Sequence, residues 1–240
     1  MLDALIKAKR LPGGEVLLRD VALTAKPGDI VALLGASGTG KTTTLRILLG
    51  LDRAFDGKVR CAAERVGAMF QEPLLLPWCS VAENLSIVAR AGAAMPDIGA
   101  LLREVGLEGS DALFPAQLSL GMARRASLAR ALAIAPDLLI LDEPFASLDR
   151  GAAASMAACL DGYRQRGVAI VMALHDIDLA TSLATRIVVL AERPAAVVYR
   201  AELASAAERA AARAVLTGRF PLVADAAALS VMDLSKEMRP

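Results

Sequence analysis

Apolar residues gather along this chain in short unbroken runs that alternate with longer amphipathic stretches. The unbroken runs predict strands buried on both faces, and they lie at residues 30–34, 138–141, 168–174 and 186–190. Helix-like stretches follow these runs at residues 43–49, 150–165 and 177–184. Buried strands in alternation with helices predict an α/β fold whose parallel sheet is covered on both faces. We expect ligands to bind at the carboxyl ends of these strands.

The remaining segments depart from that alternation. Residues 15–26 have the pattern of one or two short strands, residues 52–57 that of a loop, and residues 58–62 and 66–70 that of further strands. From about 71 to 136 strand-like runs disappear. Helix-like stretches separated by Pro and Gly replace them at residues 81–91, 98–105 and 120–135. This predicts a helical insertion in the α/β core. An alanine-rich amphipathic helix is expected at 201–216, and the residues after about 220 show no strong pattern.

Composition narrows the class of protein. The 240 residues are 55% hydrophobic, largely through alanine, and 3% aromatic, which suits a compact, helix-rich domain. No stretch of about eighteen residues lacks charges and helix breakers, so we expect no membrane span, and residues 1–10 show no signal peptide. A net charge of +1 gives no general case for nucleic-acid binding. The three scattered cysteines lack metal-ligand spacing and are expected to be reduced thiols.

A glycine-rich segment between a predicted strand and a predicted helix matches the P-loop pattern, G-x-x-x-x-G-K-[ST]. Its glycines allow successive N–H groups to turn inward around a phosphate, and the new helix directs its positive end at the same anion. The lysine can reach the β- and γ-phosphates, and the following threonine hydroxyl can bind Mg²⁺. An ordinary Gly-rich turn is the alternative, which the flanking elements disfavour. We therefore predict ATP-binding residues Gly35, Ala36, Ser37, Gly38, Thr39, Gly40, Lys41, Thr42 and Thr43.

Two acidic residues close the apolar run at 138–141. Asp142 is in a position to hold Mg²⁺, usually through water, as a Walker B aspartate does. Glu143 points to the other side of the strand, where it can accept a proton from the attacking water. An isolated Asp-Glu-Pro would more often be a solvated acidic loop. Together with the P-loop, we interpret Asp142 as a metal ligand and Glu143 as the general base.

A further motif, Leu118-Ser119-Leu120-Gly121-Met122, precedes a strongly helical run. With it, the chain resembles the ATPase subunit of ABC transporters over nearly its whole length, because signature, Walker A and Walker B follow in the expected order. The family signature is Leu-Ser-Gly-Gly-Gln, from which Leu120 and Met122 depart. The resemblance implies a P-loop NTPase (RecA-like) core, an N-terminal antiparallel β region and an inserted helical subdomain. It implies one ABC ATPase domain at 1–240, with the core at about 1–71 and 136–200, the helical subdomain at about 72–135, and a C-terminal helix and tail at about 201–240.

The resemblance also implies roles for single residues. Gln71 resembles the Q-loop glutamine, a ligand of Mg²⁺ and water, and His175, the only histidine, resembles the residue that contacts the γ-phosphate. Asp149 lies in a D-loop-like Ser-Leu-Asp. Ser119 and Gly121 would contact the ATP held by a second subunit. The implied catalytic residues are thus Glu143, His175, Lys41 and Gln71, the implied metal ligands are Thr42, Gln71 and Asp142, and the cofactors are ATP and Mg²⁺.

The same resemblance implies partners and a location. A second copy or a paralogous ATPase subunit would complete a head-to-tail dimer, with transmembrane permease subunits docked near residues 71–78 and a substrate-binding protein as an indirect partner. The location would be cytoplasmic, on the inner face of the cell membrane. The segment from Gln71 to Trp78 resembles the nitrate, sulfonate and taurine importers, although Trp78 could equally belong to the helical core. The alternatives are a non-transport ABC ATPase of DNA repair or translation and an ABC ATPase that serves a different solute.

One departure concerns the nucleotide base. Family members usually stack adenine on an aromatic residue in the N-terminal region, and residues 9–13 contain none. Base–aromatic stacking stabilises other complexes by roughly 1–3 kcal/mol. We therefore expect weaker and less base-selective nucleotide binding, with Leu11 as a poor substitute.

Overall fold

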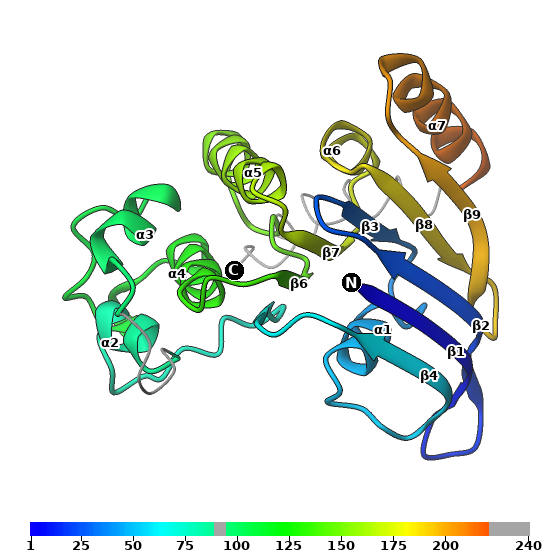
Figure 1. Cartoon of the computed structure of the whole chain (residues 1–240), viewed down its shortest axis with the longest axis horizontal. Helices are drawn as coiled ribbons and strands as arrows, with labels where there is room; N and C mark the ends of the chain where they lie inside the picture. The colour runs from blue at the N-terminus through cyan, green and yellow to red at the C-terminus, as the bar shows by residue number, and fades with distance from the viewer. Residues whose placement is uncertain (89–94, 221–240) are drawn as a thin grey trace, which may run out of the picture.

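The computed structural model describes residues 1–88 and 95–220, and its centre is a six-stranded sheet in the order β5-β6-β7-β3-β8-β9 (Figure 1). The first five strands are parallel, and β9 joins antiparallel to β8. Their bounds are β3 Ile30–Leu34, β5 Val66–Met69, β6 Leu138–Asp142, β7 Ala169–Leu174, β8 Arg186–Ala191 and β9 Ala196–Glu202. Every residue of β3, β6 and β7 is buried, as expected from the unbroken apolar runs. The predicted α/β fold with a parallel sheet is confirmed.

A second sheet of three antiparallel strands, ordered β2-β1-β4, comes from the N-terminal region. Its strands are β1 Leu2–Arg10, β2 Val16–Ala25 and β4 Phe55–Cys61. One expectation is confirmed here, one is corrected and one strand was missed. Residues 15–26 form a single strand, β4 begins inside the predicted loop at 52–57, and β1 was not expected although Leu2, Ala4 and Ile6 alternate with exposed residues. That alternation is the pattern of a half-buried strand.

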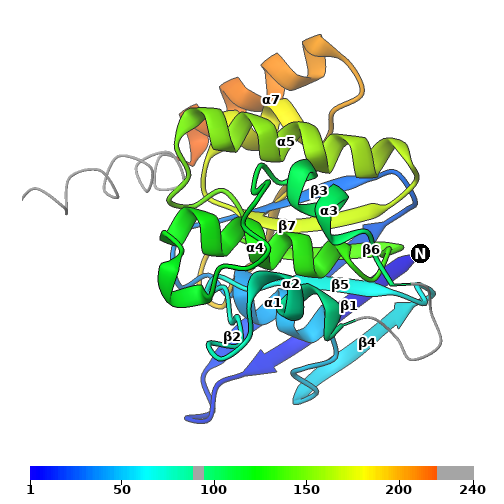
Figure 2. The same cartoon turned by 90° about the vertical axis from the view of Figure 1, so that its left-hand side faces the viewer.

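The two faces of the six-stranded sheet are covered differently. One hydrophobic core joins Ile30 and Ile170 to Met156 and Leu160 of α5 (Arg150–Gln165) and to α4 (Leu120–Leu132). The other core joins Val31 and alternate residues of the same strands to α1 (Lys41–Leu48) and to the three-stranded sheet. Figure 2 shows α5 on one side of the sheet and β1 and β4 on the other. The sheet is therefore buried on both faces, as predicted.

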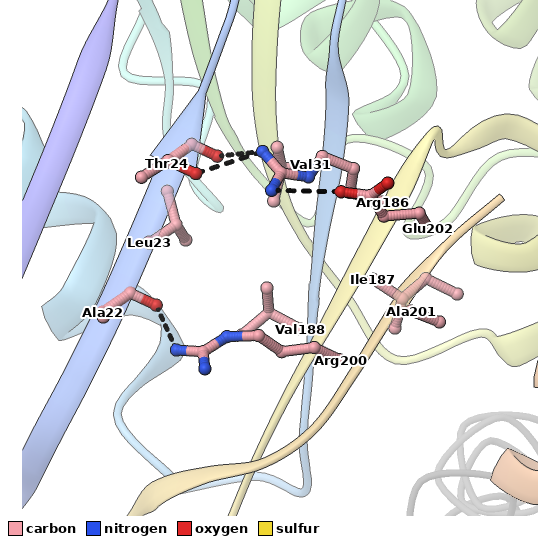
Figure 3. A pocket seen from close by; sticks show the side chains of 10 residues that line it. All are labelled: Ala22, Leu23, Thr24, Val31, Arg186, Ile187, Val188, Arg200, Ala201 and Glu202. Carbon is pink, nitrogen blue, oxygen red and sulfur yellow. Dashed lines mark hydrogen bonds and ion pairs between the residues drawn. The ribbon is translucent and has the colours of Figure 1, made fainter. Parts of the chain in front are cut away.

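The three-stranded sheet is fixed to the edge of the larger sheet beside a cavity of about 310 Å³ (Figure 3). Arg186 donates to the backbone and side-chain oxygens of Thr24 at 3.2 and 3.1 Å. Arg200 donates to the carbonyl of Ala22 at 2.9 Å. The turn after β8 also bonds to β2, because the Ala195 amide donates to the carbonyl of Leu17 at 2.8 Å. These contacts fix β2 beside β8 and β9.

Between β5 and β6 the described elements are all helical. They are α2 Val81–Ser86, α3 Ile98–Glu104, a 3₁₀ turn at Pro115–Gln117, and α4. In Figure 1 α2, α3 and α4 lie together at the side away from β1, β2 and β4. The predicted helix at 81–91 ends earlier, at Ser86, and its residues 89–91 lie outside the described part of the chain.

The remaining helices are α6 Ile177–Leu183 and α7 Ala206–Arg219. Two helix boundaries differ from expectation. The helix predicted at 120–135 ends at Leu132, because Ala135 has a φ of 49° and a proline follows it. The helix predicted at 201–216 begins only at Ala206, because Ser205 and Glu208 form a capping box there and residues 201–202 complete β9. Across residues 1–88 and 95–220, no helix combines the length and apolar character that a membrane crossing requires.

Candidate nucleotide site

The P-loop connects β3 to α1 and has the backbone geometry that its glycines predict. Gly38 and Gly40 have φ values of 79° and 85°, in the left-handed region that favours glycine. At Gly35 a Cβ atom would lie 2.6 Å from the carbonyl oxygen of Leu190, so this position has no room for a side chain. Gly40 is the N-cap of α1, and the helix N-terminus opens directly onto the loop.

Lys41 lies inside this loop and is only 7% exposed. Its Nζ donates to the carbonyl of Gly35 at 2.7 Å and to that of Ala36 at 3.2 Å. Burial lowers the pKa of the Lys41 ammonium, and the nearby carboxylates of Glu143 and Asp142 oppose that shift. A cation with limited hydration, held by two carbonyls, is suited to bind an incoming phosphate.

A cavity of about 480 Å³ joins the P-loop to two other segments that were singled out in the sequence. Its lining residues are Leu17, Ser37, Gly38, Gly40, Lys41, Thr42, Thr43, Gln71 and Glu143. Gln71 follows β5, and Glu143 follows β6, so both come from carboxyl ends of strands in the same sheet. The cavity thus brings a phosphate-binding loop, an amide side chain and a carboxylate together.

Asp142 and Thr42 form the part of the site that suits a divalent cation. Asp142 is 4% exposed, and burial raises its pKa while a hydrogen bond with the Thr42 side chain lowers it. A carboxylate, a hydroxyl and the amide oxygen of Gln71 are hard oxygen donors, which Mg²⁺ prefers, usually together with water and substrate phosphates. The described residues contain no group of three or more His, Cys, Asp or Glu that could hold a metal alone. This donor set fits Mg²⁺ bound together with a nucleotide.

The side chains of Glu143 and His175 face each other across the ends of β6 and β7. Nδ1 of His175 lies 3.7 Å from Oε2 of Glu143. The neighbouring imidazole lowers the pKa of Glu143, although burial opposes this, and the carboxylate in turn raises the pKa of His175. Both side chains are partly exposed. Glu143 is therefore held ionised, the state that a proton acceptor needs.

The turn from Glu143 to Asp149 contains unusual backbone geometry. Glu143 and Ser147 have φ values of 49° and 60°, which residues other than glycine rarely adopt. Asp149 ends the turn as the N-cap of α5, where its carboxylate accepts from the Ala152 amide at 2.8 Å. Asp149 itself does not line the cavity.

Two predicted site residues, Ser119 and Gly121, lie outside this cavity. Ser119 caps α4 by accepting from the Met122 amide at 3.2 Å. Neither residue lines the cavity with Lys41. Within one chain they belong to the start of α4, beside the 143–149 turn.

Two residues near the site were missed from the sequence. Leu17 lines the cavity, whereas Leu11 lies in a turn, is 39% exposed and is not among the lining residues. The side chains of Leu17 and Leu18 lie against Gly40 of the P-loop, 3.3 and 2.6 Å from where its Cβ atom would be. Arg124 of α4 reaches the carbonyls of Gln71 and Ala146 on either side of the site. Neither contact can be predicted from the residues next to Leu17 or Arg124 in the sequence.

Comparison with known proteins identifies the family to which this chain belongs. A sequence profile described as "ABC transporter" matches residues 18–146, from β2 to the turn after Glu143. The chain belongs to the ABC transporter family. The chain is therefore an ATP-binding subunit, and ATP hydrolysis is the activity of this family.

Curated ABC relatives match most of this chain. An aliphatic sulfonates import ATP-binding protein of Burkholderia cenocepacia is 42% identical over 203 residues, which are 81% of this chain and 75% of that protein. A protein of the same description from Frankia alni is 46% identical over 186 residues, which are 77% and 69% of the two chains.

Solved ABC structures have the same fold. A dimeric ATP-binding cassette in a post-hydrolysis state with ADP and Pi is 26% identical, with a TM-score of 0.74 over 85% of this chain and 100% of that one. A second dimeric structure of a bacterial ABC transporter cassette, 25% identical, has a TM-score of 0.76 over the same shares. The P-loop NTPase core predicted from the sequence is thereby confirmed.

Proposed function

We propose that this ABC ATPase energises an importer for a small anionic solute, with nitrate, sulfonate and taurine as the candidates. The observation that carries the ATPase part is the cavity that joins the P-loop to Gln71 and Glu143. The solute class is supported by the printed names of the sulfonate-import relatives and by the Leu-Leu-Pro-Trp stretch at 75–78.

The residues in and around the cavity have distinct roles in the proposed hydrolysis. Thr42, Asp142 and Gln71 would hold Mg²⁺, which when bound supplies charge neutralisation at the phosphate oxygens. Lys41 and the N–H groups of residues 35–43 bind and orient the β- and γ-phosphates. Glu143 accepts the proton of the attacking water, and His175 contacts the γ-phosphate and holds the Glu143 carboxylate in place.

A second subunit, a copy of this chain or a paralogue, would complete the site. Ser119 and Gly121 begin a helix whose N-terminal end is suited to a phosphate, yet they do not line the cavity of their own chain. In a head-to-tail pair they would reach the ATP on the partner's P-loop, with Asp149 at the subunit contact. The dimeric cassettes among the structural neighbours support this arrangement.

Permease subunits are proposed to dock on the segment after Gln71. Trp78 is 73% exposed and Leu74 54% exposed, which is unusual for large apolar side chains and typical of an interaction surface. Arg130 holds this segment by donating to the carbonyls of Leu74 and Pro73 at 2.7 and 3.1 Å. Trp78 is therefore not part of the core, the alternative left open by the sequence. Such docking would place the subunit on the inner face of the cell membrane, with a substrate-binding protein as an indirect partner.

The composite site can be tested by measuring ATP hydrolysis against protein concentration. The rate per chain should rise with concentration and then level off, because two copies are needed for each complete site. Size measurement by light scattering at the same concentrations gives the dimer fraction. A constant rate per chain over a range in which the protein remains monomeric would contradict the two-subunit site.

A non-transport ABC ATPase of DNA repair or translation is the competing function. The proteins that co-purify from cells distinguish these two functions. Membrane subunits that co-purify support transport, whereas nucleic acid or ribosomes in the same fraction support the alternative.

Nucleotide affinity should be weak and poorly selective for adenine. Stacking on an aromatic residue would add roughly 1–3 kcal/mol, and the described lining residues offer only Leu17 as an apolar contact for a base. Titration with ATP and GTP should give a larger Kd for ATP than in relatives with an aromatic residue, and a small difference between the two nucleotides. Leu17→Ala should weaken binding, whereas the matched change Leu11→Ala should not. ATP affinity equal to that of such relatives, with full rejection of GTP, would disprove this.

A further inference from the structure

Arg124 is a buried cation with an incomplete set of partners. It lies in the second turn of α4, five residues after Ser119, and is 7% exposed. Its Nε is buried without a hydrogen-bond partner, and no carboxylate among the described residues lies within ion-pair distance of it. Burial of a guanidinium without a carboxylate is costly. Such a side chain is expected to have a role that compensates for this cost.

The guanidinium of Arg124 connects two segments of the nucleotide site. Nη1 donates to the carbonyl of Ala146, and Nη2 lies 3.5 Å from the carbonyl of Gln71. Gln71 and Glu143 line the same cavity. One side chain of the signature helix thus contacts the backbone on both sides of that cavity.

The Ala146 carbonyl belongs to a turn that needs support. Glu143 and Ser147, on either side of it, both have positive φ values, and this conformation costs free energy for residues with a Cβ. The turn has few bonds of its own, namely Ala146 N to Glu143 O at 3.2 Å and Leu148 N to Phe145 O at 3.3 Å. A buried, charge-assisted donor such as Arg124 can hold it in this conformation.

We propose that Arg124 is a positioning residue for ATP hydrolysis, which holds the 143–149 turn so that the Glu143 carboxylate faces the cavity. This inference rests on the proposed role of Glu143. It adds a mechanical link between two parts of the site, since Ser119 caps α4 and Gly121 lies in its first turn. A displacement of this helix would reach the Glu143 turn and the Gln71 backbone through the Arg124 guanidinium. Arg124 does not line the cavity and acts through Glu143.

The test compares Arg124→Met, Arg124→Lys and the control Arg209→Met. Arg209 also donates to backbone carbonyls, those of Thr181, Ser182 and Ala184, but at the end of α6 and away from the cavity. Misplacement of a catalytic group by about 1 Å can lower the rate about 100-fold. We therefore expect Arg124→Met to lower kcat by about 10- to 100-fold while KM for ATP changes less than about threefold. Arg124→Lys should recover part of kcat, because lysine retains the charge but not the planar fork.

Hydrogen–deuterium exchange provides a readout that needs no turnover. Peptides covering residues 143–149 should exchange faster in Arg124→Met than in the wild type or in Arg209→Met. The inference is overturned if exchange in this turn is unchanged, if kcat of Arg124→Met matches that of the control, or if KM rises in proportion to the loss of kcat. Glu143→Gln separates the two hypotheses. Loss of turnover in Glu143→Gln with normal turnover in Arg124→Met refutes only the role of Arg124, whereas normal turnover in Glu143→Gln refutes the proposed base.

Discussion

Glu143→Gln is expected to abolish ATP turnover and to trap a closed, ATP-bound dimer. The amide has nearly the shape of the carboxylate and can occupy the same place in the cavity, so nucleotide binding should persist. It cannot accept the proton of the attacking water, and general base catalysis contributes roughly 10²–10⁴-fold to the rate. Because hydrolysis would reopen the pair, the dimer should remain closed for as long as ATP is bound.

Two measurements check this result together. Phosphate release should fall by at least about 100-fold, and size-exclusion chromatography with ATP and Mg²⁺ should show a dimer that the wild type does not accumulate. Glu108→Gln is a matched control, because Glu108 is exposed on the loop after α3 and away from the cavity. Wild-type turnover in Glu143→Gln would refute the assignment of the base.

Gly67→Ala is expected to destabilise the packing of α4 on the sheet. Gly67 lies in β5, directly under α4, and an added Cβ would collide with the backbone carbonyl of Ala131 and lie 2.7 Å from Cδ2 of Leu139. The carbonyl belongs to a helix and cannot rotate away, so α4 would have to move from the sheet. Added volume in a packed core typically costs about 1–3 kcal/mol.

Chemical denaturation monitored by circular dichroism measures this effect. Gly218→Ala is the control, because Gly218 lies in α7 with nothing within 4 Å of the added methyl group. In a helix this change should stabilise by about 0.5–1 kcal/mol. A Gly67→Ala protein as stable as the wild type would show that α4 does not pack on β5 in this way.

Strands and site residues could be predicted from the sequence where the pattern that identifies them lies in neighbouring residues. The parallel strands were predictable because a strand buried on both faces has an unbroken apolar run, and Lys41, Thr42, Asp142 and Glu143 lie in motifs directly attached to those strands. β9 was missed because its residues are only partly buried and carry Arg200 and Glu202 among its apolar side chains. Its antiparallel pairing with β8 is a tertiary feature.

The missed site residues share one cause. Leu17 lines the cavity on a strand, β2, that bonds to the turn after β8, more than 170 residues away along the chain. Arg124 reaches the Glu143 turn because α4 packs beside it. Contacts of this kind depend on packing between distant segments, for which a single sequence carries no periodic signal.

The exposed position of Trp78 has a practical consequence. It is the only tryptophan of the chain, and it lies on the surface proposed for the permease, 73% exposed. The intrinsic fluorescence of the protein therefore reports from one point on that surface. Its emission maximum should be that of an indole in water for the isolated chain, and a shift to shorter wavelength would mark the moment at which another molecule covers the site, without any attached dye.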